Sequence, residues 1–163
     1  MLGIDPGTTG MGYALLDAAN EPMTVLECGL IATPAEGGPA DRLLAIADGL
    51  DALIARFAPA AIALERLYFN RNVRTAMRVA EARGVALLCA ARGRLAVAEY
   101  TPQEVKLSVT GTGGADKKQV QRMLAIVLAL AQPITQDNVA DAVAIALTHA
   151  HRERFGAALA LAR

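Results

Sequence analysis

Two carboxylates in this sequence each stand at the end of a short apolar run. Asp5 follows Leu2-Gly3-Ile4 and precedes a Pro-Gly pair, which predicts a strand that ends at a tight turn. Proline disfavours helical backbone in the residue before it, so Asp5 is expected to be extended, at the very end of its strand. Glu65 ends a second apolar run, residues 60–64, in the same way. Taken singly, each carboxylate also fits an ordinary turn or a strand end that meets solvent.

A third acidic group begins a helical pattern near the C-terminus. Asp137 and Asn138 stand four and three positions before Asp141, so all three can lie on one helical face. Carboxylates gathered in one place repel each other and normally require a cation. Oxygen ligands without His or Cys favour Mg²⁺ or Mn²⁺. Two such ions, roughly 3.5–4 Å apart, are the usual means of hydrolysing a phosphodiester bond.

The elements predicted around these residues form a mixed α/β sheet flanked by helices. Short apolar or alternating runs predict five strands, at residues 2–5, 11–17, 23–32, 59–65 and 95–100. Helical spacing predicts helices at residues 40–57, 73–92, 102–110, 116–131 and 136–155. The first three strands are expected to form an antiparallel meander, with the fourth parallel to the first. That pairing brings Asp5 and Glu65 to one edge of the sheet, where open α/β sheets bind ligands, and Asp141 joins them if the last helix packs there.

The composition indicates one folded domain that spans residues 1–163. The chain has 163 residues, of which 54% are hydrophobic, and this excludes a disordered protein. Charged residues interrupt every apolar run well before the roughly 18 residues that a membrane helix needs, so no membrane segment is expected. The N-terminus lacks the features of a signal peptide, and two distant cysteines are typical of free thiols in a reducing cytoplasm. A cytoplasmic location is therefore predicted.

A net charge of zero conceals a division of charge along the chain. Residues 66–122 hold eleven Lys and Arg and four acidic residues, a local charge of +7, and the remainder carries −7. All three lysines of the chain, Lys106, Lys117 and Lys118, fall in this basic segment. A basic face suits a polyanion and the acidic remainder suits a cation, although solvated charge on surface helices gives the same pattern.

Several motifs, in order along nearly the whole chain, resemble the RuvC family of bacterial Holliday junction resolvases. They are Gly3-Ile4-Asp5-Pro6-Gly7; Glu65-Arg66-Leu67-Tyr68-Phe69 with Arg71-Asn72; Ala82-Arg83-Gly84; Gly111-Thr112-Gly113 with Ala115, Lys117 and Gln119-Val120; and Ala140-Asp141-Ala142 with Ala144-Ile145-Ala146. The resemblance implies a ribonuclease-H-like fold. It also implies a structure-specific endonuclease of recombination and repair that cuts two opposing strands of a four-way junction and leaves 5′-phosphate ends.

The resemblance further implies a two-metal site of Asp5, Glu65, Asp141 and the residue three positions before Asp141. That residue is Asn138, where relatives have Asp or His. Asn offers a carbonyl oxygen but has no charge and cannot act as a base. Either Asp137 completes the site instead, or the site favours Mn²⁺, which accepts neutral ligands more readily.

Basic and aromatic residues gain expected roles by the same resemblance. Lys106 and Lys117 match basic residues that the family places near the scissile phosphates. Tyr68 matches the loop aromatic of the family and, with Phe69, is expected to stack on unpaired bases, worth about 1–3 kcal/mol per base. Further candidates for phosphate contacts are Arg71, Arg74, Arg78, Lys118 and Arg122. A homodimer is implied, with the helix at residues 73–92 as the expected interface, and the branch-migration proteins RuvA and RuvB are implied partners.

Three other functions are alternatives. The turn Asp5-Pro6-Gly7-Thr8-Thr9-Gly10 resembles the first phosphate loop of sugar kinases and actin-like ATPases, but those proteins need two such domains. A protein that grips junctions without cutting them would explain Asn138. Ribonuclease H is the third alternative, although the basic segment with Tyr68-Phe69 fits junction DNA better.

Overall fold

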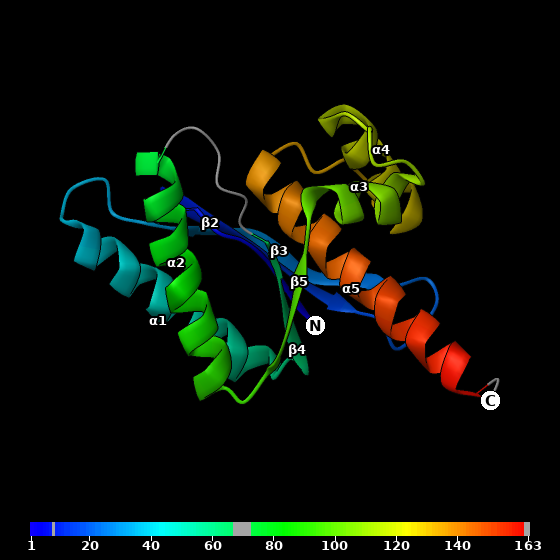
Figure 1. Ribbon diagram of the computed structural model, residues 1–163, viewed down its shortest axis with the longest axis horizontal. Coiled ribbons are helices and arrows are strands. Elements are labelled where there is room, and N and C mark those ends of the chain that lie inside the picture. The colour runs from blue at the N-terminus through cyan, green and yellow to red at the C-terminus, as the bar shows by residue number, and fades with distance from the viewer. Residues whose placement is uncertain (8, 67–72, 162–163) are drawn as a thin grey trace.

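Five strands form one mixed sheet in the part of the chain that the structure describes. This computed structural model describes residues 1–7, 9–66 and 73–161, except the side chains of residues 73–75. The strands are β1 (Leu2–Asp5), β2 (Gly10–Asp17), β3 (Thr24–Ala32), β4 (Ala61–Glu65) and β5 (Ala96–Tyr100), in the order β3-β2-β1-β4-β5 (Figure 1). The first three are antiparallel, β4 is parallel to β1, and β5 is parallel to β4. The predicted meander and the predicted parallel pairing are confirmed.

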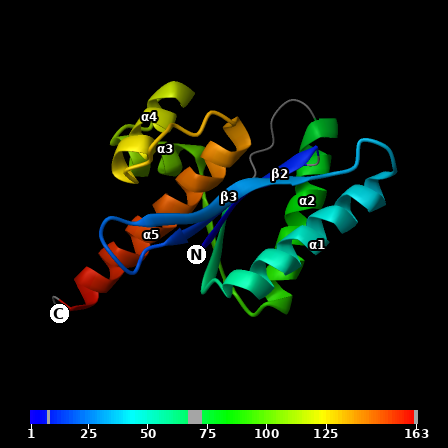
Figure 2. The same cartoon turned by 180° about the vertical axis from the view of Figure 1, so that it is seen from behind.

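Helices cover both faces of this sheet, as the two opposite views show (Figures 1 and 2). One face carries α1 (Pro39–Phe57) and α2 (Val73–Arg92), and the other carries α3 (Pro102–Thr110), α4 (Lys117–Val127) and α5 (Asp137–Leu161). The alternation of side chains along the strands divides the core in two. Ile4 and Leu64 pack towards α1 and α2, whereas Ala63 packs towards α5. Asp5 and Glu65, one residue further along each strand, therefore face the side of α5.

Two glycines allow α5 to lie very close to the central strands. A Cβ atom on Gly3 would stand 2.3 Å from the carbonyl oxygen of Ala142, and one on Gly12 would stand 2.0 Å from that of Asn138. Any other residue at these positions would push the helix away, because the atoms it would meet belong to the backbone. This approach brings the first turns of α5, with Asp141, to the end of β1.

Some predicted boundaries are wrong. The fourth helix was expected to continue to residue 131, but α4 ends at Val127. Leu128 turns inward and is buried, and Ala129 takes a left-handed φ of 47°, which stops the helix. The last helix runs to Leu161, beyond the predicted residue 155, since the residues after Gly156 are nearly all Ala and Leu, which favour helix. No helix among the described residues is long and apolar enough to cross a membrane.

Candidate active site

The ends of two parallel strands hold the first two carboxylates of the site. Ile4 of β1 is paired with Leu64 of β4, so Asp5 and Glu65 stand side by side at the next position. Burial, followed by the charges of Asp141 and Glu65, raises the pKa of Asp5 to about 7. Burial and the charge of Asp141 also raise the pKa of Glu65. These groups are therefore close neighbours whose negative charges the nearby Lys117 compensates only in part.

Asp141, on the second turn of α5, is the third carboxylate at this edge. Burial raises the pKa of Asp141, while the charge of nearby Lys117 opposes that shift. Among the described residues, no three His, Cys, Asp or Glu side chains already form a group that could hold a metal ion. The pKa shifts and the lack of such a group are consistent with one arrangement. The carboxylates are near enough to influence each other's charge, but farther apart than the ligands of one bound metal ion. A cation that drew them together would relieve their repulsion, so hard oxygen donors of this kind fit Mg²⁺ or Mn²⁺.

Two lysines line a cleft with the carboxylates. The cleft has a volume of about 190 Å³, and its polar walls are Glu65, Lys106, Lys117 and Asp141. The apolar remainder of its lining consists of Pro102, Val105, Val120, Ala144 and Ile145. Negative and positive groups thus face the same space, which suits a phosphate held between a cation site and ammonium groups. The structure brings together Glu65, Asp141 and both lysines that the sequence pointed to.

Lys117 connects helix α4 to the start of helix α5. Its Nζ atom lies 3.0 Å from Oδ2 of Asp137 and 3.9 Å from Oδ2 of Asp141. The hydrogen bond to Asp137 is the main cause that raises the pKa of Lys117. Gln121 donates from Nε2 to the other oxygen of Asp137, Oδ1, at 3.2 Å. Both carboxylate oxygens of Asp137 are consequently engaged by α4.

Asn138 lies against the turn between β1 and β2. Its Nδ2 atom donates a long hydrogen bond of 3.5 Å to the carbonyl oxygen of Gly10. The side chain is half-buried, and the backbone of the same residue touches Gly12. Whether Asn138 or Asp137 completes a metal site stays a prediction.

The predicted DNA contacts fall partly outside the described residues. Tyr68, Phe69 and Arg71 lie outside them, and the side chain of Arg74 is likewise not described. The exposed candidates are Arg78 on α2 and Lys118 and Arg122 on α4. Helices α2 and α5 both begin at the edge of the sheet that carries the carboxylates (Figure 1). The roles of all these residues in DNA binding stay predictions.

Gln121 is a residue that the sequence analysis missed. It follows Lys117 by four positions, so the two share one face of α4 and reach the same carboxylate. The spacing was visible in the sequence, but the partner of that face was not. Gly12 was missed in the same way, since its importance depends on how closely α5 packs against β2.

The fold and the site together define a class. A mixed five-stranded sheet with carboxylates at the ends of its central strands, completed by an acidic helix, is the arrangement of ribonuclease-H-like nucleases. The family model described as "Crossover junction endodeoxyribonuclease RuvC" matches residues 1–149, and the chain belongs to this family. The predicted family and fold class are confirmed.

Individual relatives agree with this assignment. The crossover junction endodeoxyribonuclease RuvC of Heliobacterium modesticaldum is 47% identical over 158 residues, which cover 97% of this chain and 98% of the relative. The corresponding protein of Moorella thermoacetica is 49% identical and covers 92% of this chain and 90% of its own. Among solved structures, T. thermophilus RuvC in complex with Holliday junction substrate has a TM-score of 0.89 and 32% identity, and covers 95% of this chain and 94% of its own.

Proposed function

We propose that this protein is a crossover junction endodeoxyribonuclease that cuts two opposing strands of a four-way DNA junction during recombination and repair. The observation that carries the proposal is the cluster of Asp5, Glu65 and Asp141 at one edge of the sheet, where burial and mutual repulsion raise their pKa values and two lysines share a cleft with Glu65 and Asp141. Membership of the RuvC family supports the reaction. The relative solved with a Holliday junction substrate supports the choice of DNA.

The proposed site binds divalent cations, Mg²⁺ or Mn²⁺, through Asp5, Glu65 and Asp141, with Asn138 or Asp137 as the fourth ligand. Held by these residues, a pair of cations would supply activation of water and stabilisation of the leaving oxygen of a phosphodiester. The protein contributes carboxylates on two rigid strand ends and a helix, so their positions are fixed by the packing of the sheet. Hydrolysis leaves a 5′-phosphate and a 3′-hydroxyl.

The two lysines of the cleft are proposed to hold the scissile phosphate. Lys106 and Lys117 stand beside Glu65 and Asp141, so a phosphate that enters the cleft meets ammonium groups next to the carboxylates. The exposed basic side chains of α2 and α4 would extend this contact along the DNA arms. Affinity for the junction is therefore expected to fall steeply with salt.

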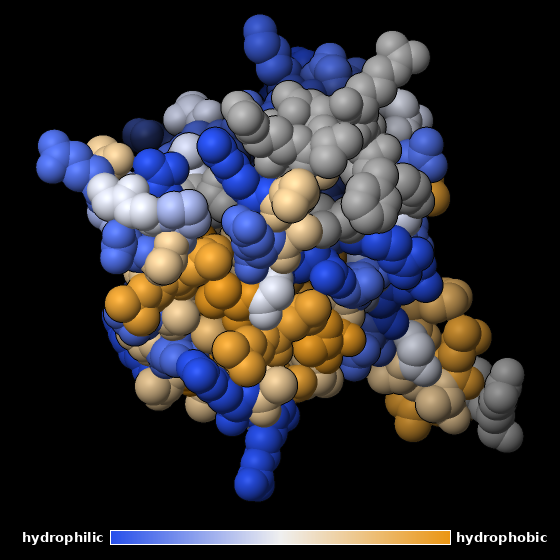
Figure 3. Space-filling model, turned by 60° about the vertical axis from the view of Figure 1, so that its left-hand side comes forward, coloured by the Kyte–Doolittle hydropathy of each residue, from blue (hydrophilic) through white to orange (hydrophobic). Residues whose placement is uncertain are grey.

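Symmetric cutting requires two active sites related by a two-fold axis, so the proposal includes a homodimer. Apolar side chains gather on the side of the molecule formed by α1 and α2 (Figure 3). They include Leu44, Met77 and Leu88, whose exposed fractions are 60%, 61% and 50%. A patch of this kind supports α2 as part of the interface. RuvA and RuvB as partners, a cytoplasmic location and a single domain over residues 1–163 complete the proposal.

The test uses a labelled four-way junction, a linear duplex of the same sequence and an RNA–DNA hybrid, each with Mg²⁺ or Mn²⁺. We expect paired nicks in the junction alone, and a loss of at least about 1000-fold in rate for Asp5→Asn. Asp48→Asn is the matched control, because it replaces an exposed carboxylate of α1 on the opposite face of the sheet from α5. This variant should cut normally. Binding without cutting in either metal would favour the junction-binding alternative, and cleavage of the hybrid alone would indicate ribonuclease H.

A further inference from the structure

Asp137 is held in a way that differs from the three carboxylates of the site. Burial is the main cause that raises the pKa values of Asp5, Glu65 and Asp141, and no hydrogen bond from another side chain to these three carboxylates is seen among the described residues. Asp137 has a donor on each oxygen: the ammonium of Lys117 at 3.0 Å and the amide of Gln121 at 3.2 Å. A carboxylate with both oxygens already bonded is poorly placed to bind a metal ion.

The start of α4 is fixed independently of these contacts. Asp116 caps the helix by accepting from the backbone of Gln119, whose side chain in turn accepts from the backbone of Asp116. Lys117 is the first residue after the cap, and Gln121 follows one turn later. The same helix face therefore presents an ammonium and an amide to Asp137, and each donates to one oxygen of the carboxylate.

The contact between Lys117 and Asp137 contributes little to the stability of the fold. The side chain of Lys117 is 64% exposed and that of Asp137 is 54% exposed, and ion pairs between exposed groups add little to stability. The contact restrains the long, flexible side chain of Lys117, whose ammonium also lies 3.9 Å from Asp141. Its effect is thus on the position of Lys117 rather than on the stability of the fold.

We propose that Asp137 is a positioning residue that holds the ammonium of Lys117 beside the active-site carboxylates, and that it is not a metal ligand. The inference rests on the proposed nuclease function. Asp137, one helical turn before Asp141, would keep the ammonium of Lys117 next to the cleft even when a cation held by Asp141 repelled it. Lys117 then remains where a phosphate enters, instead of swinging into solvent.

The first test observes the ammonium directly. The chain has three lysines, so ¹⁵N NMR of the lysine ammonium groups gives few signals, and Lys117→Arg identifies the one from Lys117. We expect the Lys117 signal to be less mobile and slower in hydrogen exchange than that of exposed Lys118, with or without Mg²⁺. Asp137→Asn should make both signals alike. Release of Lys117 when Mg²⁺ is added, or no change in Asp137→Asn, would overturn the proposal.

A matched variant separates positioning from the loss of one charge. Asp116→Asn removes the same charge from the residue next to Lys117 and keeps a good helix cap. We expect Asp137→Asn and Asp116→Asn to bind Mn²⁺ within about twofold of each other in calorimetry. A loss of affinity of tenfold or more in Asp137→Asn alone would make Asp137 a ligand and contradict the proposal.

The kinetic test asks whether Asp137 acts through Lys117. A misplaced catalytic group costs about 10- to 100-fold, so Asp137→Asn should lower the single-turnover rate by that factor and leave the Kd for the junction within about twofold. In the Lys117→Met background, the same substitution should cost less than about twofold. Additive losses would overturn the proposal. If the parent protein does not cut junctions, the proposed function fails, whereas the NMR and Mn²⁺ experiments still decide the role of Asp137.

Discussion

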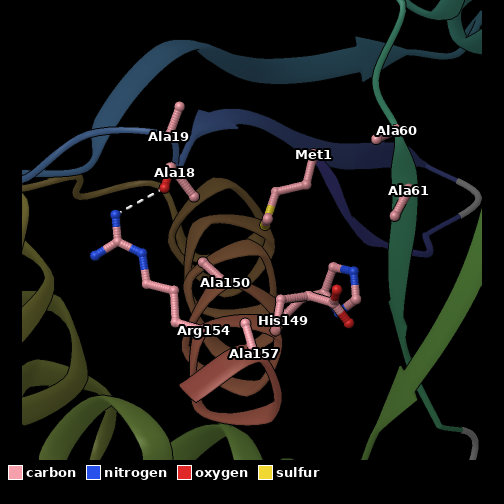
Figure 4. Close-up of a pocket in the computed structure, with 10 residues that line it drawn as sticks. Met1, Ala18, Ala19, Ala60, Ala61, His149, Ala150, Arg154 and Ala157 are labelled. Carbon is pink, nitrogen blue, oxygen red and sulfur yellow. Dashed lines mark hydrogen bonds between the residues drawn. The ribbon is translucent and has the colours of Figure 1, made fainter. Parts of the chain in front are cut away.

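The two ends of helix α5 differ in the partners that surround their charged side chains. At its start, Asp141 joins Asp5 and Glu65, and the pKa values of all three carboxylates are raised. Near its end, Arg154 donates to the carbonyl oxygens of Ala18 and Asn20, each at 2.7 Å (Figure 4 shows the bond to Ala18). The first end brings three carboxylates together with Lys117 and Lys106 nearby, whereas the other end pairs a single guanidinium with carbonyl oxygens.

The two hollows beside α5 show why volume alone is a poor guide to the candidate active site. The hollow at the end of α5, lined by several alanines together with Met1, His149 and Arg154, has a volume of about 400 Å³ (Figure 4). The cleft beside the carboxylates has about 190 Å³. Yet His149 is bonded to the hydroxyl of Tyr100 at 2.8 Å, and Arg154 donates to two carbonyl oxygens, so these two side chains of the larger hollow already have partners. Buried carboxylates with raised pKa values, facing two lysines, distinguish the smaller cleft and are the feature that indicates a functional site.

The largest effect is expected when one of the three clustered carboxylate charges is removed. The pKa of Asp5 is about 7 in the folded protein and has an ordinary value of 3.8. The folded state thus binds the proton of the Asp5 carboxyl more tightly than the unfolded state does. The stability that this protonation adds is present below about pH 4 and is lost as pH rises through 7. In metal-free protein at pH 8, Asp5→Asn should therefore raise the free energy of unfolding by about 2 kcal/mol, since each pKa unit is worth about 1.4 kcal/mol and the site is only partly buried.

Urea unfolding with a chelator at pH 5 and pH 8 measures this effect. The gain from Asp5→Asn should shrink at pH 5. The same measurements on Asp48→Asn, which replaces an exposed carboxylate on α1, control for the general effect of removing one negative charge. A variant less stable than the parent at pH 8 would mean that the charge of Asp5 is compensated in the folded protein. The contrast between the two ends of α5 would then be lost.

A smaller effect is expected from adding a charge to the same end. Asn138→Asp supplies one of the two residues, Asp or His, that the family resemblance implies at this position. It should strengthen Mn²⁺ binding about tenfold if residue 138 is a ligand, which equals about 1.4 kcal/mol. Calorimetry measures the affinity, and Gln136→Glu, an exposed position two residues earlier, controls for the effect of charge alone. Equal affinities of the two variants would show that residue 138 does not coordinate the metal.

Much of this arrangement could be predicted from local sequence signals. The Pro-Gly pair after Asp5 and the apolar run before Glu65 fixed two strand ends, and parallel pairing alone placed them at one edge. The orientation of the first turn of α5 could not be predicted, because it depends on how closely Gly3 and Gly12 let the helix approach the sheet. The partners of Asp137 and Asn138 follow from that orientation, so the sequence left their roles open.

The smallest expected effect lies at the far end of α5. Arg154→Ala removes the two hydrogen bonds to the carbonyl oxygens of Ala18 and Asn20 and an ion pair with Glu21. Charged donors on carbonyl groups are worth more than exposed ion pairs, so we expect a loss of about 1 kcal/mol in the free energy of unfolding. Arg154→Lys should recover little of it, because an ammonium cannot reproduce the fork of the guanidinium. The rate of junction cleavage should stay within about twofold of the parent in both variants. A tenfold loss of rate would mean instead that the packing at this end sets the position of Asp141, and that the two ends of the helix act as one unit.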